Sequence, residues 1–374
     1  KGHLMAKKGL TRKHVAHSRK FERQRWAIII GAAVVGLSVI GLLAFGFYQQ
    51  FIIGPREPVA TVGGVPIRTD AYQKMVRYRR FLTDLMLERL RAQRIQIDPN
   101  DEDQQSLAQY LNQQIQQIQV QKASLPRQVL DELISGELIR QEAAERSITV
   151  TAKEVQEEIE RQFGYLPNLP SPTPAEGTPM PTVTPMTYEQ FQQKYSEYLE
   201  VLKGQTSLTE ADFRRLIETG LLEGKLREAF AAQVPTTDEH VHARHILVET
   251  EEEAQANLAK LEAGEDFEAL AKEVSLDEGT KEKGGDLGWF TRDQFGIPIE
   301  VAETAFNLKV GELSDAVKSP LGYHIIEVLG REERELQPTI LQMRQWKAFN
   351  DWLEEQLQSE RVKRNWSSDK VPPP

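Results

Sequence analysis

Four histidines outside the N-terminal end are the residues of this 374-residue chain best suited to chemistry: His240, His242, His245 and His324. The first three lie in the run HVHARH, which raises the question of a metal site. Side chains alternate along a strand, so His242 and His245 should face opposite sides. The chain has no cysteine and no H-E-x-x-H sequence to support a metal. We therefore expect no metal and no cofactor, and the histidines are either parts of a polar site or buried structural residues.

A second unusual stretch is KGGDLGWF, from Lys283 to Phe290, with three glycines in six positions. Glycine loses more backbone entropy on folding than any other residue, so such a cluster indicates backbone conformations that other residues avoid. The acid within it, Asp286, is a candidate for chemistry or for stabilising a turn. The sequence contains no G-x-S-x-G motif, phosphate-binding loop or dinucleotide fingerprint.

The elements around these residues predict a compact α+β unit. HARHILV, DAVKS and YHIIEV have the composition of strands, and EEEAQANLAKLEAG and DFEALAKEVS have helical spacing. The region before them is predicted to be nearly all helix after a small hairpin at Gly63–Gly64. Helices are expected from Thr69, over the glutamine-rich residues 101–121, from near Pro126, and after a capping box formed by Thr151 and Glu154.

Two further segments have a distinct composition. Residues 165–186 contain seven of the 19 prolines and are predicted to be a flexible or polyproline-like insertion. Residues 339–362 carry an apolar stripe with aromatic residues. A helix of this kind should pack against other helices, and we expect it to return to the N-terminal helical region.

The N-terminal end predicts a membrane anchor. Residues 1–25 hold nine basic residues and one acidic residue, Glu22, and the 23 residues from Trp26 to Tyr48 carry no charge. A helix of that length spans about 34 Å, which is sufficient for the core of a bilayer. A nucleic-acid arm, a buried soluble helix and a cleaved signal peptide are the alternatives. We favour a signal anchor with the basic residues in the cytoplasm and the acidic bulk of the chain outside.

The run from ARHILV through DFEALAKEVSLDEGTKEKGGDLGWF to GELSDAVKSPLGYHIIEV strongly resembles the parvulin family of peptidyl-prolyl cis/trans isomerases. The flanking pattern, VATVGGVPIRTDAY followed by VLDELISGELIRQEAAERSITVTAKEV, resembles the chaperone region of SurA- and PrsA-type foldases. The resemblance implies an α+β fold: a four-stranded antiparallel sheet with flanking helices, inserted in an all-α SurA-like domain, plus one transmembrane helix. The expected organisation is a cytoplasmic tail (1–25), a signal anchor (26–53), a helical chaperone domain (54–235) with a proline-rich insertion (165–187), a parvulin domain (236–332) and a returning C-terminal segment (333–374).

The resemblance also implies site residues. His245, Asp277, Ser319 and His324 match the polar catalytic positions of parvulins. Leu287, Phe295, Val301 and Phe306 match or flank positions that line the proline pocket. Val301 stands where an aromatic residue is usual, and a two-residue extension in GIPIEV allows Ile299 to take that place instead. In this motif Asp286 is expected to stabilise a turn, while Asp277 is the catalytic candidate.

The resemblance implies a membrane-anchored, extracytoplasmic foldase of the cell membrane that isomerises X–Pro bonds. Its expected partners are unfolded or partly folded exported polypeptides with X–Pro bonds, and no nucleic acid is expected. A homodimer is possible. The alternative is a holdase chaperone whose parvulin domain is weak or inert, motivated by Val301. A purely structural membrane scaffold is a third option.

Overall fold

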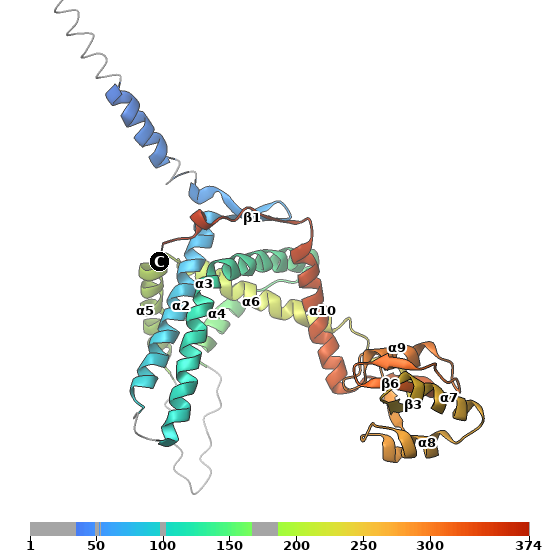
Figure 1. Cartoon of the computed structure of the whole chain (residues 1–374). Coiled ribbons are helices and arrows are strands. Elements are labelled where there is room, and N and C mark those ends of the chain that lie inside the picture. Colours follow the sequence, from blue (N-terminus) through green and yellow to red (C-terminus); the bar gives the residue numbers. More distant parts are fainter. Residues whose placement is uncertain (1–34, 49–51, 53, 98–101, 167–185, 374) are drawn as a thin grey trace, which may run out of the picture. The chain divides into compact units, whose positions relative to one another are not determined.

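The computed structural model describes residues 35–48, 52, 54–97, 102–166 and 186–373 (Figure 1). Residues 35–48 are helical, and the rest of the predicted anchor lies almost wholly outside the described residues. Among the residues described, no helix is both long enough and apolar enough to cross a bilayer. The predicted insertion at 165–187 lies outside them as well, apart from its first two and last two residues.

The chain divides into two compact units. The first unit comprises residues 1–141, 151–219 and 356–374, and the second unit comprises residues 142–150 and 220–355. The domain limits expected from the sequence stay predictions. Helices and strands together make the chain α+β, as expected.

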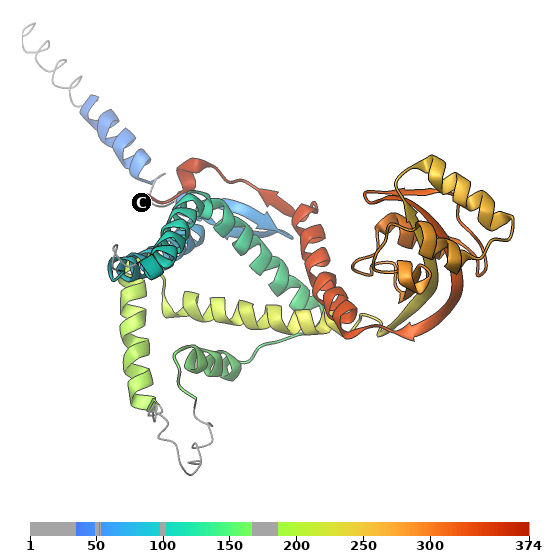
Figure 2. The same ribbon diagram turned by 60° about the horizontal axis from the view of Figure 1, so that its bottom comes forward.

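The first unit combines helices with a small three-stranded sheet of order β2-β1-β7. The predicted hairpin is present, with β1 (Pro58–Val62) antiparallel to β2 (Val65–Arg68). Strand β7 (Val362–Arg364), drawn in red, pairs with the blue β1 (Figure 2). The helices of this unit include α2 (Thr69–Ile95), most of α3 (Glu102–Glu145), α4 (Ala152–Gln162), α5 (Tyr188–Thr206) and the first part of α6 (Glu210–Ala231).

The start of α4 follows the sequence prediction, whereas the start near Pro126 was wrong. Thr151 accepts from the Glu154 amide at 3.2 Å, and Glu154 accepts from the Thr151 amide at 2.7 Å, which completes the capping box. Pro126 lies inside the continuous helix α3. A proline here removes one helical hydrogen bond, but α2 holds both sides of it. Lys122 pairs with Asp84 at 2.5 Å, and Glu132 pairs with Arg79.

The second unit contains a four-stranded antiparallel sheet of order β4-β3-β6-β5. Its central strands, β3 (Thr237–Val248) and β6 (Gly322–Glu335), pair along their whole length, so β6 continues well beyond the predicted YHIIEV. The edges are β4 (Asp286–Phe290) and β5 (Val317–Ser319). Helix α10 (Pro338–Gln358) joins this unit through Phe349, whose ring lies 5.9 Å from that of Phe230.

Apolar residues on the two faces of the sheet form separate cores. Helices α7 (Glu251–Glu262) and α8 (Phe267–Val274) cover one face, and α9 (Ile299–Asn307) covers the other (Figure 1). The first core packs Leu270 against Ile246 and Ile325. The second core packs Val301 and Phe306 against Ile326 and Val328. Burial on both faces fixes the register of the central strands, since a one-residue slip would exchange the faces.

The glycines of KGGDLGWF are required where the chain enters β4. Gly284 and Gly285 have φ values of +70° and +82°. A Cβ atom on Gly285 would lie 2.1 Å from the backbone oxygen of His245. The carbonyl of Gly285 accepts from the His245 amide at 2.9 Å, so the contact is part of the sheet. Only glycine fits this approach to His245.

The substitution Gly285→Ala should destabilise the second unit by more than about 2 kcal/mol. A left-handed residue with a side chain costs roughly 1–2 kcal/mol, and the clash with His245 adds to this. Gly311→Ala is the matched control, because Gly311 has φ +83° but a Cβ atom at this position would have nothing within 4 Å. Opening free energies of β3 amides from native-state hydrogen exchange measure both variants. Equal losses in the two would contradict the proposed contact.

Candidate active site

Two histidines on neighbouring strands form the centre of the site. His245 on β3 is opposite Ile326, and His324 on β6 is opposite Leu247, so the histidines are diagonal neighbours. Their rings stack with centroids 5.2 Å apart and an interplanar angle of 19°. Their Nδ1 atoms are 3.1 Å apart, which is a hydrogen-bond distance. Both residues are buried, and His324 has no exposed surface.

Hydrogen bonds continue from this pair in both directions. His245 Nε2 lies 2.8 Å from Asp277 Oδ2 and 3.1 Å from Thr280 Oγ1. His324 Nε2 lies 2.7 Å from Ser319 Oγ. The four polar residues predicted from the sequence are therefore brought together. With Thr280 they form a continuous set of polar contacts, which we call the histidine chain: Asp277, Thr280, His245, His324 and Ser319.

One arrangement of protons satisfies the histidine chain with both rings neutral. The Asp277 carboxylate only accepts, so His245 Nε2 carries a proton and donates to it. The Nδ1 atom of a neutral His245 then accepts, and His324 Nδ1 must be the donor. His324 Nε2 is left as an acceptor for the Ser319 hydroxyl, whose oxygen accepts from the Leu321 amide at 3.0 Å. We assign these tautomers from the hydrogen-bond partners.

The charge states of His245, His324 and Asp277 follow from their burial and from the hydrogen bonds that Asp277 accepts at the end of the histidine chain. Burial lowers the pKa of His324 to about 4, and the neighbouring His245 lowers it in the same direction while Asp277 opposes. Burial also lowers the pKa of His245, against the opposing effect of Asp277. For Asp277, burial alone would raise the pKa, but hydrogen bonds from Thr280, His245 and the Gly279 amide outweigh it, and the pKa is lowered. At neutral pH the site thus holds a carboxylate beside two uncharged imidazoles.

The loop between α8 and β4 holds Asp277 in place. The Thr280 hydroxyl donates to Asp277 Oδ2 at 2.6 Å, and the Gly279 amide donates to Oδ1 at 3.2 Å. The buried Ser275 hydroxyl accepts from the Leu247 amide at 3.2 Å, and the Leu276 amide donates to the Leu247 carbonyl at 2.8 Å. The loop is therefore fastened to β3 beside His245, and 29% of the Asp277 side chain remains exposed.

The sequence analysis missed two residues of this arrangement, Thr280 and Ser275. Both are small hydroxyl residues within three positions of Asp277 in SLDEGT. Asp, Ser and Thr at such short separations commonly hydrogen-bond to one another and to the local backbone. That spacing was the available signal, and it would have identified Thr280 as a partner of the acid.

The predicted pocket residues do not share one environment. Val301 is fully buried and Phe306 is 6% exposed, and both belong to the core beneath α9. Phe295 is 94% exposed. Leu287 is half-buried and packs on the edge of the same core. The sequence predicts that Val301 lines the proline pocket, but the Val301 side chain has no accessible surface.

The residue at which α9 begins accounts for the direction in which Val301 points. Helix α9 begins at Ile299, just after Pro298. Residues two apart on a helix point about 200° away from each other. Because Val301 faces the core, Ile299 faces outward and is 63% exposed. Ile299, the alternative raised by the sequence, is therefore the apolar residue of this segment that a substrate could contact.

Comparison with family models identifies two segments of the chain. Residues 230–332 match the PPIC-type PPIASE domain. Residues 92–167 match the SurA-like N-terminal domain. The first match contains every residue of the histidine chain.

Curated relatives carry the name foldase protein PrsA. One from Caldanaerobacter subterraneus is 37% identical over 211 residues, which cover 54% of this chain and 56% of the relative. Another, from Geobacillus kaustophilus, is 50% identical over 94 residues, or 25% of this chain and 33% of the relative. The chain thus matches about half or less of the length of these two relatives. A solved peptidylprolyl isomerase (PrsA) from Bacillus cereus is 24% identical, with a TM-score of 0.35 over 64% of this chain and 80% of that one.

The matched segments and the histidine chain agree with the resemblance found in the sequence. Residues 230–332 match a peptidyl-prolyl isomerase domain, and residues 92–167 match a SurA-like N-terminal domain. The chain therefore combines a parvulin-type PPIC peptidyl-prolyl isomerase domain with a SurA-like N-terminal domain.

Proposed function

We propose that the whole chain is a foldase that isomerises X–Pro peptide bonds in exported polypeptides. The proposal rests on the continuous histidine chain, which lies inside the segment matched by the PPIC-type domain. The names of the curated relatives agree with this function. The reaction requires no cofactor, because no covalent bond is made or broken.

To catalyse this reaction, the site must stabilise the twisted conformation of the X–Pro imide bond. Rotation about an X–Pro bond takes tens to hundreds of seconds, since twisting destroys amide resonance across a barrier of about 18–20 kcal/mol. An apolar surface that holds the proline ring and removes water favours the less conjugated, twisted form. We assign that surface to Leu287 and Ile299, with the exposed Phe295 at its rim.

The histidine chain supplies fixed polarity rather than a proton. Both imidazoles are neutral and every donor in the chain has an acceptor, so a proton transfer would break existing hydrogen bonds. Fixed dipoles stabilise developing charge without reorganisation during the reaction. We propose that Asp277, the exposed end of the chain, tunes the electrostatics of the substrate imide, while His245 and His324 hold Asp277 and the central strands in place.

The alternative of an inert holdase loses its main motivation. It rested on Val301 in place of the usual aromatic residue, but Val301 is a core residue and Ile299 is the exposed one. A weak isomerase that also holds unfolded clients stays compatible with the SurA-like segment. Isomerase assays with site variants distinguish the two.

The cellular setting is proposed from the sequence. The basic residues 1–25 and the uncharged run 26–48 support a single-pass anchor, with the N-terminus in the cytoplasm and the rest outside the membrane. We also propose that the parvulin domain is inserted in the SurA-like domain, since β7 pairs with β1 and thereby joins distant parts of the sequence in the first unit. We also propose a homodimer, and the resemblance to PrsA-type foldases is its only basis.

Stability of the second unit should fall as the pH is lowered from 7 to 5. The folded state keeps His324 neutral to a pKa of about 4, whereas an unfolded histidine takes up a proton near pH 6.5. The unfolded state then binds more protons, so the contribution of His324, complete above pH 6.5, should be about 2 kcal/mol smaller at pH 5. Opening free energies of β3 and β6 amides, corrected for intrinsic exchange, measure the change.

In the same measurement, His324→Gln should reduce the pH dependence, whatever its effect on stability at pH 7. His242→Gln is the control, because His242 lies on β3 outside the histidine chain and pairs with Asp286. It should keep the fall seen in the unsubstituted protein. A His324→Gln protein with an unchanged pH dependence would rule out His324 as the source.

The full chain should accelerate cis/trans exchange in a proline-containing tetrapeptide, and Asp277→Ala and Ile299→Ala should each lower kcat/KM about tenfold or more. That loss equals roughly 1.4 kcal/mol of transition-state stabilisation. Asp286→Asn is the matched control, since Asp286 lies outside the histidine chain, and its rate should stay within about twofold. Protease-coupled or NMR exchange assays give the rates.

Failure of the unsubstituted chain to accelerate exchange would remove the isomerase function. Full activity in both Asp277→Ala and Ile299→Ala would leave the isomerase in place but reject these residues as its site. Suppression of client aggregation that persists in both variants would locate the holdase activity elsewhere in the chain.

A further inference from the structure

One face of α2 in the first unit carries a row of side chains that bind main-chain carbonyls. Gln73 Nε2 donates to the Lys370 carbonyl at 3.0 Å. Arg77 Nε donates to the Thr206 carbonyl at 3.2 Å. Arg80 Nη1 donates to the carbonyls of Pro372 and Pro373, at 2.8 and 2.9 Å. The spacing of four and three residues places these donors on one side of the helix, where Gln73 and Arg80 contact the chain's own C-terminal segment.

The contact with Pro372 and Pro373 suits proline in particular. Proline has no backbone N–H, so its carbonyl is the only main-chain group that needs a partner. The Arg80 side chain offers donors alone, so it can satisfy the carbonyls of an extended proline segment at this position. Pro372 is buried in this contact.

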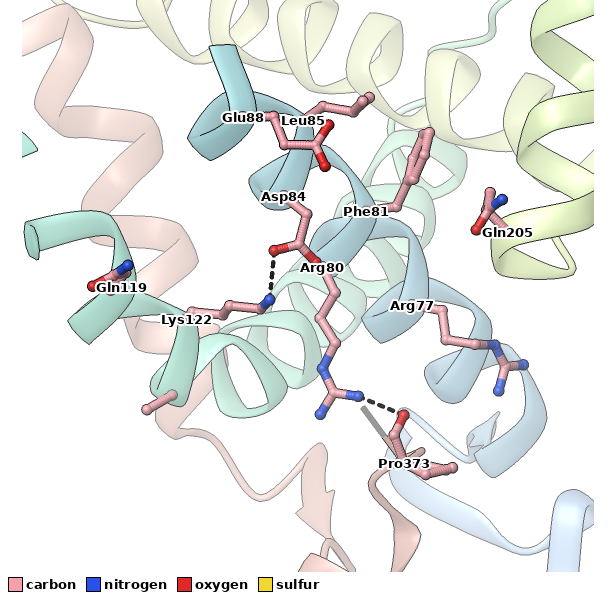
Figure 3. Close-up of a pocket in the computed structure, with 11 residues that line it drawn as sticks. Arg77, Arg80, Phe81, Asp84, Leu85, Glu88, Gln119, Lys122, Gln205 and Pro373 are labelled. Carbon is pink, nitrogen blue, oxygen red and sulfur yellow. Dashed lines mark hydrogen bonds and ion pairs between the residues drawn. The ribbon is translucent and has the colours of Figure 1, made fainter. Parts of the chain in front are cut away.

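A cavity of about 800 Å³ continues from Pro373 along α2. In Figure 3, Pro373 lies beside Arg80 at one end, and Leu85 and Glu88 lie farther along the helix. Lys122 of α3 and Asp84 of α2, which both line the cavity, form an ion pair with their charged atoms 2.5 Å apart (Figure 3). This volume lies in the range of ligand-binding pockets. Along α2, Arg77 to Glu88 spans about 16 Å, enough for roughly five residues of polyproline helix.

The composition of the cavity favours a peptide over a small anion. Phe81 and the half-exposed Leu85 supply apolar surface for proline rings. Asp84 and Glu88 place carboxylates beside the basic side chains, and Asp84 already neutralises Lys122. A phosphate or carboxylate ligand would be repelled by these acids.

The C-terminal segment is anchored before it reaches the cavity. Trp366 Nε1 donates to the Tyr72 hydroxyl at 2.7 Å, and the Asn365 amide donates to the Val59 carbonyl at 2.8 Å. Arg127 lies over the Trp366 ring, 5.5 Å from its centroid. These contacts do not involve Arg80, so residues 371–373 can leave the cavity while the preceding residues stay bound.

We propose that this cavity, which we call the α2 groove, binds extended proline-containing polypeptide segments, and that the C-terminal segment occupies one end of it through Pro373 in competition with them. The groove is a second peptide site, separate from the histidine chain. It does not depend on the proposed isomerase activity, and an inert parvulin domain would leave it intact. Clients rich in proline would then be held by the first unit through their carbonyls.

Binding of a fluorescein-labelled peptide with the sequence SDKVPPP and blocked ends tests the proposal by fluorescence anisotropy. A protein that ends at Lys370 should bind it at least about tenfold more tightly than the full chain, because its groove is free. The same peptide with alanine at the three proline positions should bind at least about fivefold more weakly. Equal affinity for the two peptides would contradict proline as the ligand class.

Two substitutions in the shortened protein locate the site. Arg80→Ala removes the carbonyl donors, and Leu85→Asp changes an exposed side chain that can be replaced without disturbing the core. Each should weaken binding about tenfold or more. Arg91→Ala, at an exposed position on the same helix, is the control and should leave the affinity unchanged.

The proposal is overturned if removing residues 371–374 does not increase affinity, or if Arg80→Ala and Leu85→Asp bind as well as the unsubstituted protein. Isomerase rates on a tetrapeptide, measured on the same proteins, should not change. A fall in the isomerase rate of these groove variants would contradict the separation of the groove from the histidine chain, whereas an inactive unsubstituted chain that still binds the peptide would count against the proposed isomerase function alone.

Discussion

The hydrogen bond between the rings of His245 and His324 is the interaction on which the rest of the site depends. It joins the two central strands of the sheet at 3.1 Å, within a buried region where an unpaired imidazole nitrogen would be costly. Once both rings are neutral, the direction of each further hydrogen bond is determined. Asp277 must accept at one end, and Ser319 must donate at the other.

The surrounding backbone holds His245 and His324 in position. Gly285 lets the chain pass against the carbonyl of His245, and Ser275 ties the Asp277 loop to Leu247 on the same strand. The opposite cores, one under α9 and one under α7 and α8, hold β3 and β6 in register. Asp277 is thereby the charged end of this polar network.

The sequence predicted much of this arrangement because its motifs are dense between His245 and His324. It identified the four polar residues, the capping box at Thr151, and the segments that form β3, β5, β6, α7 and α8 of the second unit. It could not fix which side chain of GIPIEV faces outward, because that depends on the residue at which α9 begins. It placed a helix start at Pro126, since the pairs that keep α3 continuous there come from α2, far away in the sequence. The α2 groove has no local pattern either, because residues near 80 and 372 meet only in the folded chain.

The most direct test of the account is the protonation of the two imidazoles at pH 7, measured by ¹⁵N–¹H correlation NMR of histidine-labelled protein. The account predicts two neutral rings, with the proton on Nε2 of His245 and on Nδ1 of His324. It also predicts that Asp277→Asn perturbs the His245 signals more than those of His242. An imidazolium at either position, or a proton on Nε2 of both rings, would contradict the directed chain of hydrogen bonds and the role assigned to it.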